Sequence, residues 1–101
     1  MHYKLIASRE YLDWIQAETD KAKVQISKRL SAIEADGHFG TSKDLGEGVS
    51  ELKWQIGRRI YYAYIPESRI LLLLGGNKNG QDKDITQAKK ILKRWHEKNE
   101  K

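Results

Sequence analysis

Apolar residues in the first third of the chain recur at helical spacing, which predicts two consecutive helices. Ser8 is a candidate N-cap for the first helix, and Thr19 or Asp20 can cap the second. Gly37 is a natural C-cap at the end of the second helix. Because so few residues separate the two helices, we expect a helical hairpin. The apolar stripes consist of Tyr11, Trp14 and Ile15 in the first helix and of Ala22, Ile26, Leu30 and Ile33 in the second.

Short alternating or continuous apolar segments elsewhere predict four strands. Residues 2–7 alternate loosely, and residues 49–56 also alternate. Residues 59–65 are rich in β-branched and aromatic side chains. Residues 69–74 form a nearly continuous apolar run, as expected of a central strand. Residues 38–48, which contain three glycines, are expected to form a loop.

The segment after the last strand predicts a turn and then a basic amphipathic helix. Gly75, Gly76 and Asn77 are expected to end the strand in a sharp turn, since glycine tolerates unusual backbone angles. The helix is expected to begin near Asp82 or Asp84. The predicted order is β-α-α-β-β-β-α. This order describes an α+β fold in which an antiparallel-type, four-stranded sheet packs with an N-terminal helical hairpin and a C-terminal helix.

Length and composition narrow the class of protein. A chain of 101 residues with 39% hydrophobic residues is expected to form a single domain, residues 1–101. Its net charge of +5 favours polyanionic partners such as nucleic acid, the ribosome, an anionic membrane or an acidic protein. The absence of cysteine excludes disulfides and thiolate nucleophiles. It also fits a cytoplasmic location. The longest apolar run, residues 70–74, is far shorter than the ~20 residues of a membrane span.

Two kinds of site are not expected. His2, His38 and His96 are far apart in the sequence and lack the spacing of metal ligands, so no metal site is predicted. Residues 75–78 lack the spacing of a phosphate-binding loop and the Ser or Thr that follows its lysine. No nucleotide cofactor is therefore predicted, and the chain is expected to act without a cofactor.

Cations gather between residues 43 and 78, beside phenols and amides. Lysine and arginine can stabilise the charge that develops on phosphorus, and tyrosine can stack on an exposed base. Metal-free RNA cleavage needs no protein nucleophile, because the 2′-hydroxyl attacks the adjacent phosphate. Each residue also has a structural alternative, such as strand packing for tyrosine or protection of a sheet edge for lysine. The cluster consists of Lys43, Lys53, Arg58, Arg59 and Lys78, with Tyr61, Tyr62, Tyr64 and Gln81 close by.

Strand parity decides which of these side chains share a face. If residues 56–58 form a three-residue loop, Gln55 pairs with Arg59 and Lys53 pairs with Tyr61. Lys53, Arg59 and Tyr61 then lie on one polar face. A two-residue loop would turn Arg59 toward the core, because a slip of one residue reverses the faces. We favour the odd loop, since burying an unpaired arginine is costly.

A series of motifs runs through residues 10–92. Tyr11, Trp14 and Ile15 are followed by Arg29-Leu30 and by glycines with Lys43. G-E-G-V-S-E-L-K then occupies residues 46–53 and R-I-Y-Y residues 59–62. An apolar strand, G-G-N-K-N-G-Q at 75–81 and D-I-T-Q-A at 84–88 complete the series. Their order and spacing resemble the RelE/HigB family of bacterial toxins, and within it the short phage-type addiction module killer proteins.

This resemblance implies the small α+β fold of RelE-type toxins and cleavage of mRNA, usually on the ribosome and without a metal. It also implies a hetero-oligomer with a cognate antitoxin, often a helix-turn-helix DNA-binding protein. The family positions and the neighbouring side chains together give the candidate site. We expect the catalytic residues to be Arg59, Lys78 and Lys53. We expect the RNA-binding residues to be Lys43, Arg58, Tyr61 and Gln81.

The chain departs from the family pattern at several positions. Lys53 stands where arginine is usual, which keeps the charge but loses the bidentate fork. Asn77 stands where an acidic residue is common. The C-terminal catalytic tyrosine or histidine of some relatives has no counterpart, so the general base and acid stay unassigned. Two alternatives stay open: a same-fold toxin that inhibits a protein such as DNA gyrase, as in the ParE branch, and a non-catalytic RNA- or ribosome-binding module.

Overall fold

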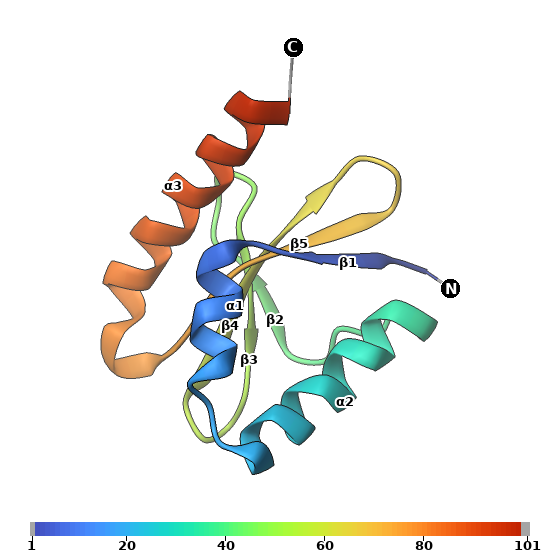
Figure 1. Cartoon of the computed structure of the whole chain (residues 1–101), viewed down its shortest axis with the longest axis vertical. Helices are drawn as coiled ribbons and strands as arrows, with labels where there is room; N and C mark the ends of the chain where they lie inside the picture. Colours follow the sequence, from blue (N-terminus) through green and yellow to red (C-terminus); the bar gives the residue numbers. More distant parts are fainter. Residues whose placement is uncertain (1, 100–101) are drawn as a thin grey trace.

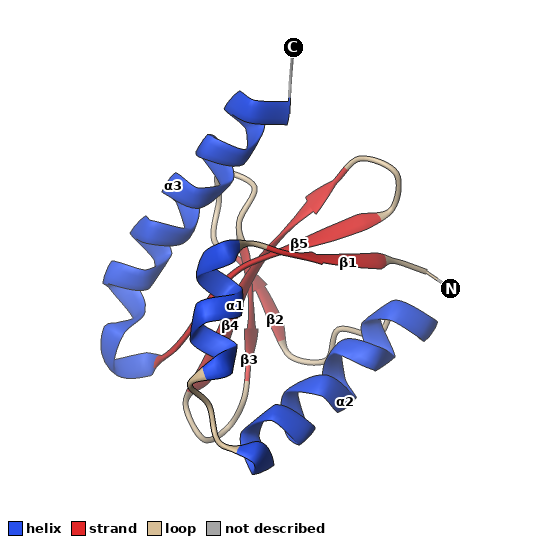
Figure 2. Cartoon of the chain, viewed as in Figure 1, coloured by secondary structure: helices blue, strands red, loops and turns tan. Residues whose placement is uncertain are grey.

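The computed structural model describes residues 2–99, which form a five-stranded sheet with helices on both of its faces (Figures 1 and 2). The strand order is β1-β5-β4-β3-β2. The α+β class, the N-terminal helical pair and the C-terminal helix are as predicted. The elements are β1 Lys4–Ala7, α1 Arg9–Gln16, α2 Asp20–Asp36, β2 Ser42–Asp44, β3 Ser50–Lys53, β4 Arg58–Ile65, β5 Arg69–Asn77, the 3₁₀ turn Lys78–Gly80 and α3 Gln81–Asn99.

The predicted helix caps are confirmed. The Ser8 hydroxyl accepts a hydrogen bond from the Tyr11 amide, and the Thr19 hydroxyl accepts one from the Ala22 amide. Each cap satisfies one of the backbone donors that the start of a helix leaves free. Gly37 ends α2 with a φ of 68°, in the left-handed region that glycine enters without strain.

The sheet differs from the prediction in strand number and in the direction of one pair. β2 lies within the segment expected to be a loop, and it pairs with β3 from Ser42↔Leu52 to Asp44↔Ser50. All three β2 residues are exposed, so the strand has no apolar alternation that the sequence could reveal. β1 pairs in parallel with β5, whereas the other pairs are antiparallel. Parallel pairing requires a long connection, which here carries both N-terminal helices.

Gly75 and Gly76 were expected to form a turn, but they lie inside β5. A Cβ atom on Gly75 would be 2.1 Å from the Trp14 ring, and one on Gly76 would be 2.1 Å from Asp84 Oδ2. The two glycines therefore allow α1 and α3 to approach the sheet closely, and the strand continues to Asn77. The turn itself is made by the 3₁₀ residues, and α3 begins at Gln81, slightly before the predicted start.

Each face of the sheet carries its own apolar core. α3 packs Ala88, Ile91 and Leu92 on one face, and α1 and α2 pack Tyr11, Ile26 and Ile33 on the other. Strand residues alternate between the two cores, as a sheet covered on both sides requires. The sheet side of the α3 core is made by Val49, Tyr61, Ala63, Ile65, Leu71 and Leu73, and that of the opposite core by Leu52, Ile60, Tyr62, Ile70 and Leu72.

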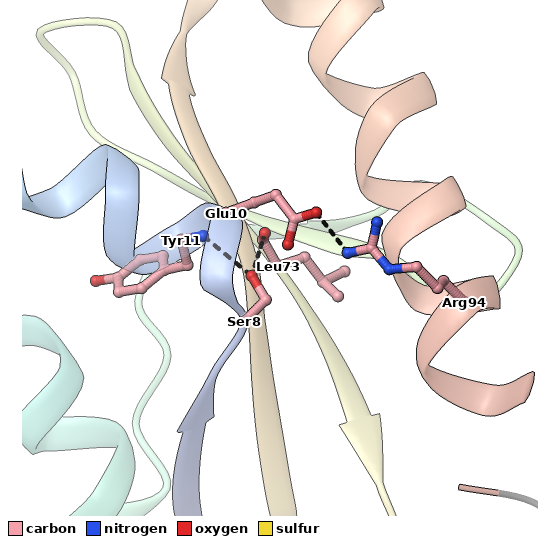
Figure 3. A network of polar contacts seen from close by, with 5 residues as sticks. All are labelled: Ser8, Glu10, Tyr11, Leu73 and Arg94. Atoms are coloured by element: carbon pink, nitrogen blue, oxygen red, sulfur yellow. Dashed lines mark hydrogen bonds and ion pairs between the residues drawn. The ribbon is translucent and has the colours of Figure 1, made fainter. Parts of the chain in front are cut away.

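An irregularity in β5 links the sheet to α1 (Figure 3). Tyr61 pairs with Leu74 and Tyr62 with Leu72, so Leu73 is the extra residue of a bulge. The carbonyl oxygen of Leu73 accepts a 2.7 Å hydrogen bond from the Ser8 hydroxyl, which also caps α1. Arg94 of α3 forms an ion pair with Glu10 of α1 nearby. These contacts fix the start of α1 against β5 and connect the helices of the two faces.

Candidate functional site

The β3–β4 hairpin sets the arrangement of the predicted site. Lys53 lies opposite Arg59 and Glu51 lies opposite Tyr61. The predicted pairs, Lys53 with Tyr61 and Gln55 with Arg59, were therefore wrong by two residues. An even shift preserves parity, so the prediction that Lys53, Arg59 and Tyr61 share a face is confirmed. The face is not the polar one that was predicted, because α3 covers it and both Arg59 and Tyr61 are buried. The strand leaves the ladder after Lys53 because residues 54–57 form a turn in which the Gly57 amide donates to the Trp54 carbonyl at 3.0 Å.

The pairing register brings five of the predicted residues and one other into a single group. Lys43 on β2 is opposite Glu51 on β3, so it joins the same face as Lys53 and Arg59. This is the face that α3 covers, and the first residue of α3 contacts Glu51. We call the group the sheet-end cluster. It consists of Lys43, Glu51, Lys53, Arg59, Tyr61 and Gln81.

Glu51 occupies the centre of the sheet-end cluster. Its side chain is fully buried, and both carboxylate oxygens accept hydrogen bonds from the Gln81 amide, at 3.0 and 3.2 Å. A buried carboxylate needs such donors, because its loss of hydration is otherwise uncompensated. Sequence reasoning gave Glu51 no role. The available signal was its parity, which places an acid on the same face as Val49 and Lys53.

Tyr61 differs from the surface residue that the sequence suggested. It is fully buried in the α3 core, so its ring is not available to stack on a base. Its hydroxyl is also buried and has no hydrogen-bond partner within residues 2–99. Burial raises the pKa of this phenol well above its usual value, and the nearby Asp84 and Glu51 raise it further. Tyr61 therefore remains protonated at neutral pH.

Arg59 contacts the backbone of the hairpin turn through its side chain. It is 8% exposed, and its Nη1 donates to the carbonyl oxygens of Arg58, at 3.1 Å, and of Trp54, at 3.5 Å. Its Nε is buried and has no hydrogen-bond partner among the described residues. Arg59 thus combines a structural contact with at least one donor that the fold leaves unused.

Lys78 and Lys43 lie at the rim of the same end of the sheet. Lys78 is exposed, its amide donates to the Gly57 carbonyl at 2.9 Å, and its aliphatic chain lies beside Gly57. The structure therefore places Lys78 against the turn that joins Lys53 to Arg59. Lys43 is also exposed, on the edge strand β2. Both ammonium groups are accessible to a large ligand.

Arg58 is not brought into the sheet-end cluster. It precedes Arg59 on β4 and projects to the opposite face, where its Nη1 donates to Gln25 Oε1 at 3.2 Å. Its guanidinium carbon lies 5.4 Å from the centre of the Trp54 ring. Of the seven predicted site residues, Arg58 alone is separated from the others by the sheet.

The cations at this end of the molecule lack carboxylate partners. Within residues 2–99, ion pairs involve Arg69, Lys89 and Arg94, and none involves a predicted site residue. Unpaired cations in one region attract a polyanion more strongly than cations that carboxylates neutralise. The described chain contains no group of three or more His, Cys, Asp or Glu side chains that could hold a metal ion. No helix in this part of the chain is long and apolar enough to cross a membrane.

Comparison with known sequences identifies one family and one relative. Residues 13–96 match the family described as "Phage derived protein Gp49-like (DUF891)". A protein of Haemophilus influenzae, of uncharacterised function, is 38% identical over 71 residues. That match covers 68% of this chain and 71% of the relative. The family match spans α2, the whole β2–β5 region and most of α3, so it includes every predicted site residue.

Comparison with solved structures identifies the fold. A mutant of the E. coli toxin RelE in the free state superposes with a TM-score of 0.71 at 19% identity, covering 89% of this chain and 97% of that one. The structure of the E. coli RelBE toxin–antitoxin complex matches with a TM-score of 0.64 at 19% identity, covering 74% of this chain and 95% of that one. The RelBE2 toxin–antitoxin complex of Mycobacterium tuberculosis matches with a TM-score of 0.58 at 12% identity, covering 76% of this chain and 99% of that one. At these identities the likeness shows a RelE-like fold.

Proposed function

This chain belongs to the family of phage-derived Gp49-like proteins, and from that membership and its RelE-like fold we propose that it is the toxin of a type II toxin–antitoxin system. We propose further that it is a metal-independent endoribonuclease that cleaves mRNA, with the ribosome as the site of action. The RelE structures that it resembles are of a toxin alone and of toxin–antitoxin complexes. A cognate antitoxin, of the helix-turn-helix DNA-binding kind, is accordingly the proposed protein partner.

The observation that carries the proposal is the sheet-end cluster with Lys78 at its rim. Lys53 and Arg59 are directly paired on one face, and Lys78 lies against the turn that connects them. Three cations converging on one region suit a phosphate that gains charge in a pentacoordinate transition state. Lys43, on the neighbouring strand, extends the positive region along the path of an RNA chain.

The proposed reaction transfers the phosphate within the RNA. The 2′-hydroxyl loses its proton and its oxygen attacks the adjacent phosphorus, and the bond from phosphorus to the 5′-oxygen then breaks. The leaving 5′-oxygen takes up a proton. The products carry a 2′,3′-cyclic phosphate and a 5′-hydroxyl. In this scheme Arg59 and Lys78 stabilise the negative charge, and Lys53 holds the phosphate in place.

One observation favours a second candidate function, a ribosome- or RNA-binding module without catalysis. The carboxylate and the phenol of the cluster, Glu51 and Tyr61, are both fully buried. A proton acceptor must reach the 2′-hydroxyl, so catalysis requires either a movement that exposes Glu51 or a base supplied by the ribosome. A binding module requires neither.

Controlled expression followed by mapping of mRNA 5′ ends tests the proposal. A nuclease produces new 5′ ends within minutes of induction, and these ends should not appear when Arg59 or Lys78 is replaced by alanine. Inhibition of growth without new 5′ ends indicates the binding module or a toxin with a protein target. DNA damage or loss of supercoiling in the same cultures identifies a DNA gyrase poison. Purified antitoxin is expected to bind the chain tightly and suppress the cleavage.

A further inference from the structure

A pocket of about 450 Å³ lies between α2 and the β3–β4 turn, beside the sheet-end cluster. This volume falls within the range of about 300–1,000 Å³ that is common for ligand pockets. The α2 side contributes Gln25, Lys28 and Arg29, and the strand end and turn contribute Lys53, Trp54 and Ile56. Lys53 therefore belongs to both the pocket and the sheet-end cluster.

The pocket is positively charged and contains no acid. Lys28, Arg29 and Lys53 line it, and the buried Arg58 lies behind the lining, next to Gln25 and Trp54. None of these four cations forms an ion pair within residues 2–99. The sheet-end cluster, by contrast, includes the carboxylate of Glu51. The pocket is therefore expected to attract an anion.

One wall of the pocket contains a flat surface made by the Trp54 ring and the Arg29 guanidinium. The Arg29 guanidinium lies 4.3 Å from the centre of the Trp54 ring. It is held there by hydrogen bonds to the carbonyl oxygens of Phe39 and Thr41 on one side and of Lys53 on the other. Since all these acceptors are neutral backbone groups, the charge of Arg29 is fixed in place without being neutralised. Indole rings and guanidinium planes are the surfaces on which proteins stack unpaired bases.

We propose that this pocket binds one nucleotide of single-stranded RNA next to the phosphate that is cleaved, an inference that rests on the proposed function. The base lies against the Trp54–Arg29 layer, and the amides of Gln25 and Gln55 face its edge. Lys28 contacts its phosphate, and the buried Arg58 adds positive charge behind the wall. Arg58 and Arg59 are neighbours on β4 that are largely buried and project to opposite faces, so positive charge is present on both sides of the strand end, toward the pocket and toward the cluster.

The chemistry of the lining favours RNA over an acidic protein segment. Carboxylates would satisfy Lys28 and Arg58, but they would gain nothing from a flat aromatic layer or from amides at its edge. Ile56, which is 73% exposed at the tip of the turn, adds an apolar contact beside the layer. A nucleotide uses all three kinds of group, since it combines an anion, a flat ring and a polar edge.

Binding of a short, fluorescently labelled 2′-O-methyl RNA, which cannot be cleaved, tests the proposal by anisotropy. Lys28→Glu is expected to weaken binding about tenfold or more, whereas Lys90→Glu on the exposed side of α3 weakens it much less. Lys28→Ala reduces the logarithmic salt slope by roughly 0.7, the value for one phosphate on a single strand. Trp54→Leu weakens binding about tenfold and Trp54→Phe restores most of it, because stacking needs a ring.

The outcomes separate this inference from the proposed function. If the wild-type chain cleaves mRNA but Lys28→Glu and Lys90→Glu bind the RNA equally, the pocket inference is overturned and the function stands. Equal binding by Trp54→Leu and Trp54→Phe, in variants that melt at the same temperature, overturns the stacking part. If polyglutamate binds as tightly as the RNA with the same dependence on Trp54, the pocket is a site for acidic protein. Absence of cleavage with Lys28- and Trp54-dependent binding supports the pocket in a non-catalytic module.

Discussion

The side-chain amide of Gln81 donates hydrogen bonds to both carboxylate oxygens of Glu51, at 3.0 and 3.2 Å. Gln81 is the first residue of α3 and Glu51 is a buried residue of β3, so this contact joins the start of the last helix to the sheet. It lies among the cations that we propose to act on RNA. This contact therefore contributes to the stability of the fold by satisfying a buried carboxylate.

Gln81→Leu is expected to lower the free energy of unfolding by about 2 kcal/mol, because Glu51 is left buried without donors. In the Glu51→Leu background the same change is expected to cost much less, which gives a coupling energy in a double-mutant cycle. Urea unfolding at neutral pH measures the free energy of unfolding of each variant and hence the coupling energy. Gln87→Leu, at an exposed position of α3, serves as the control. Additive effects at positions 51 and 81 would contradict the contact.

Lys78→Ala and Arg59→Ala are each expected to relieve growth inhibition, since each removes charge stabilisation worth ~2–4 kcal/mol in the transition state. Their effects on stability should differ. Lys78 is exposed, so its variant should melt like the wild type, whereas Arg59→Ala loses the hydrogen bonds to the hairpin turn and about 1 kcal/mol of stability. Toxicity at matched expression and thermal melting are measured together. Full toxicity of both variants removes these residues from the site.

Gly75→Ala and Gly76→Ala are expected to destabilise the protein by about 1–3 kcal/mol each, because a Cβ atom would overlap the Trp14 ring or Asp84 Oδ2 at 2.1 Å. Gly80→Ala is a matched control, since its nearest atom would be 3.4 Å away. Chemical denaturation provides the measurement. Asp84→Ala should partly rescue Gly76→Ala but not Gly75→Ala. Equal stability of all three glycine variants would show that the close approaches are absent.

Stability is expected to fall as pH rises above 10. Burial raises the pKa of Tyr11 to about 12, and Tyr61 shifts in the same direction. Because the folded state holds the phenol proton more tightly than the unfolded state, the stabilisation is present below pH 10 and is lost between about 10 and 12. Unfolding by urea across this range measures the loss. Tyr11→Phe should flatten the curve, and Tyr64→Phe should change it in the same direction, because desolvation and the neighbouring Tyr62 raise the pKa of Tyr64 to about 12 as well.

RNA cleavage is expected to persist in EDTA, provided that ribosome integrity is maintained by other means. A substrate with 2′-deoxyribose at the cleaved position should be inert, because it lacks the proposed nucleophile. Binding should weaken steeply with salt, by roughly 0.7 in the logarithmic slope for each phosphate contacted. Cutting of the deoxy substrate, or a need for a divalent ion in the chemical step, would contradict the mechanism.

The sequence by itself determined the elements whose signals are local. Ser8, Thr19 and Gly37 could be identified as caps, because capping depends on residues within one helical turn. Arg59 and Tyr61 were predictably on one face, since side chains alternate along a strand, and the choice of an odd loop correctly added Lys53 to that face. The order of motifs was sufficient to indicate the α+β fold and the family.

The tertiary structure alone decided which of these residues are accessible and what lies beside them. Gly75 and Gly76 resemble a turn in the sequence, but contacts with Trp14 and Asp84, far away in the chain, explain their lack of side chains. The pairing of Lys53 with Arg59 and the burial of Tyr61 depend on the register between strands and on the packing of α3. These contacts are between residues that are far apart in the sequence, so the local pattern of a single segment does not predict them.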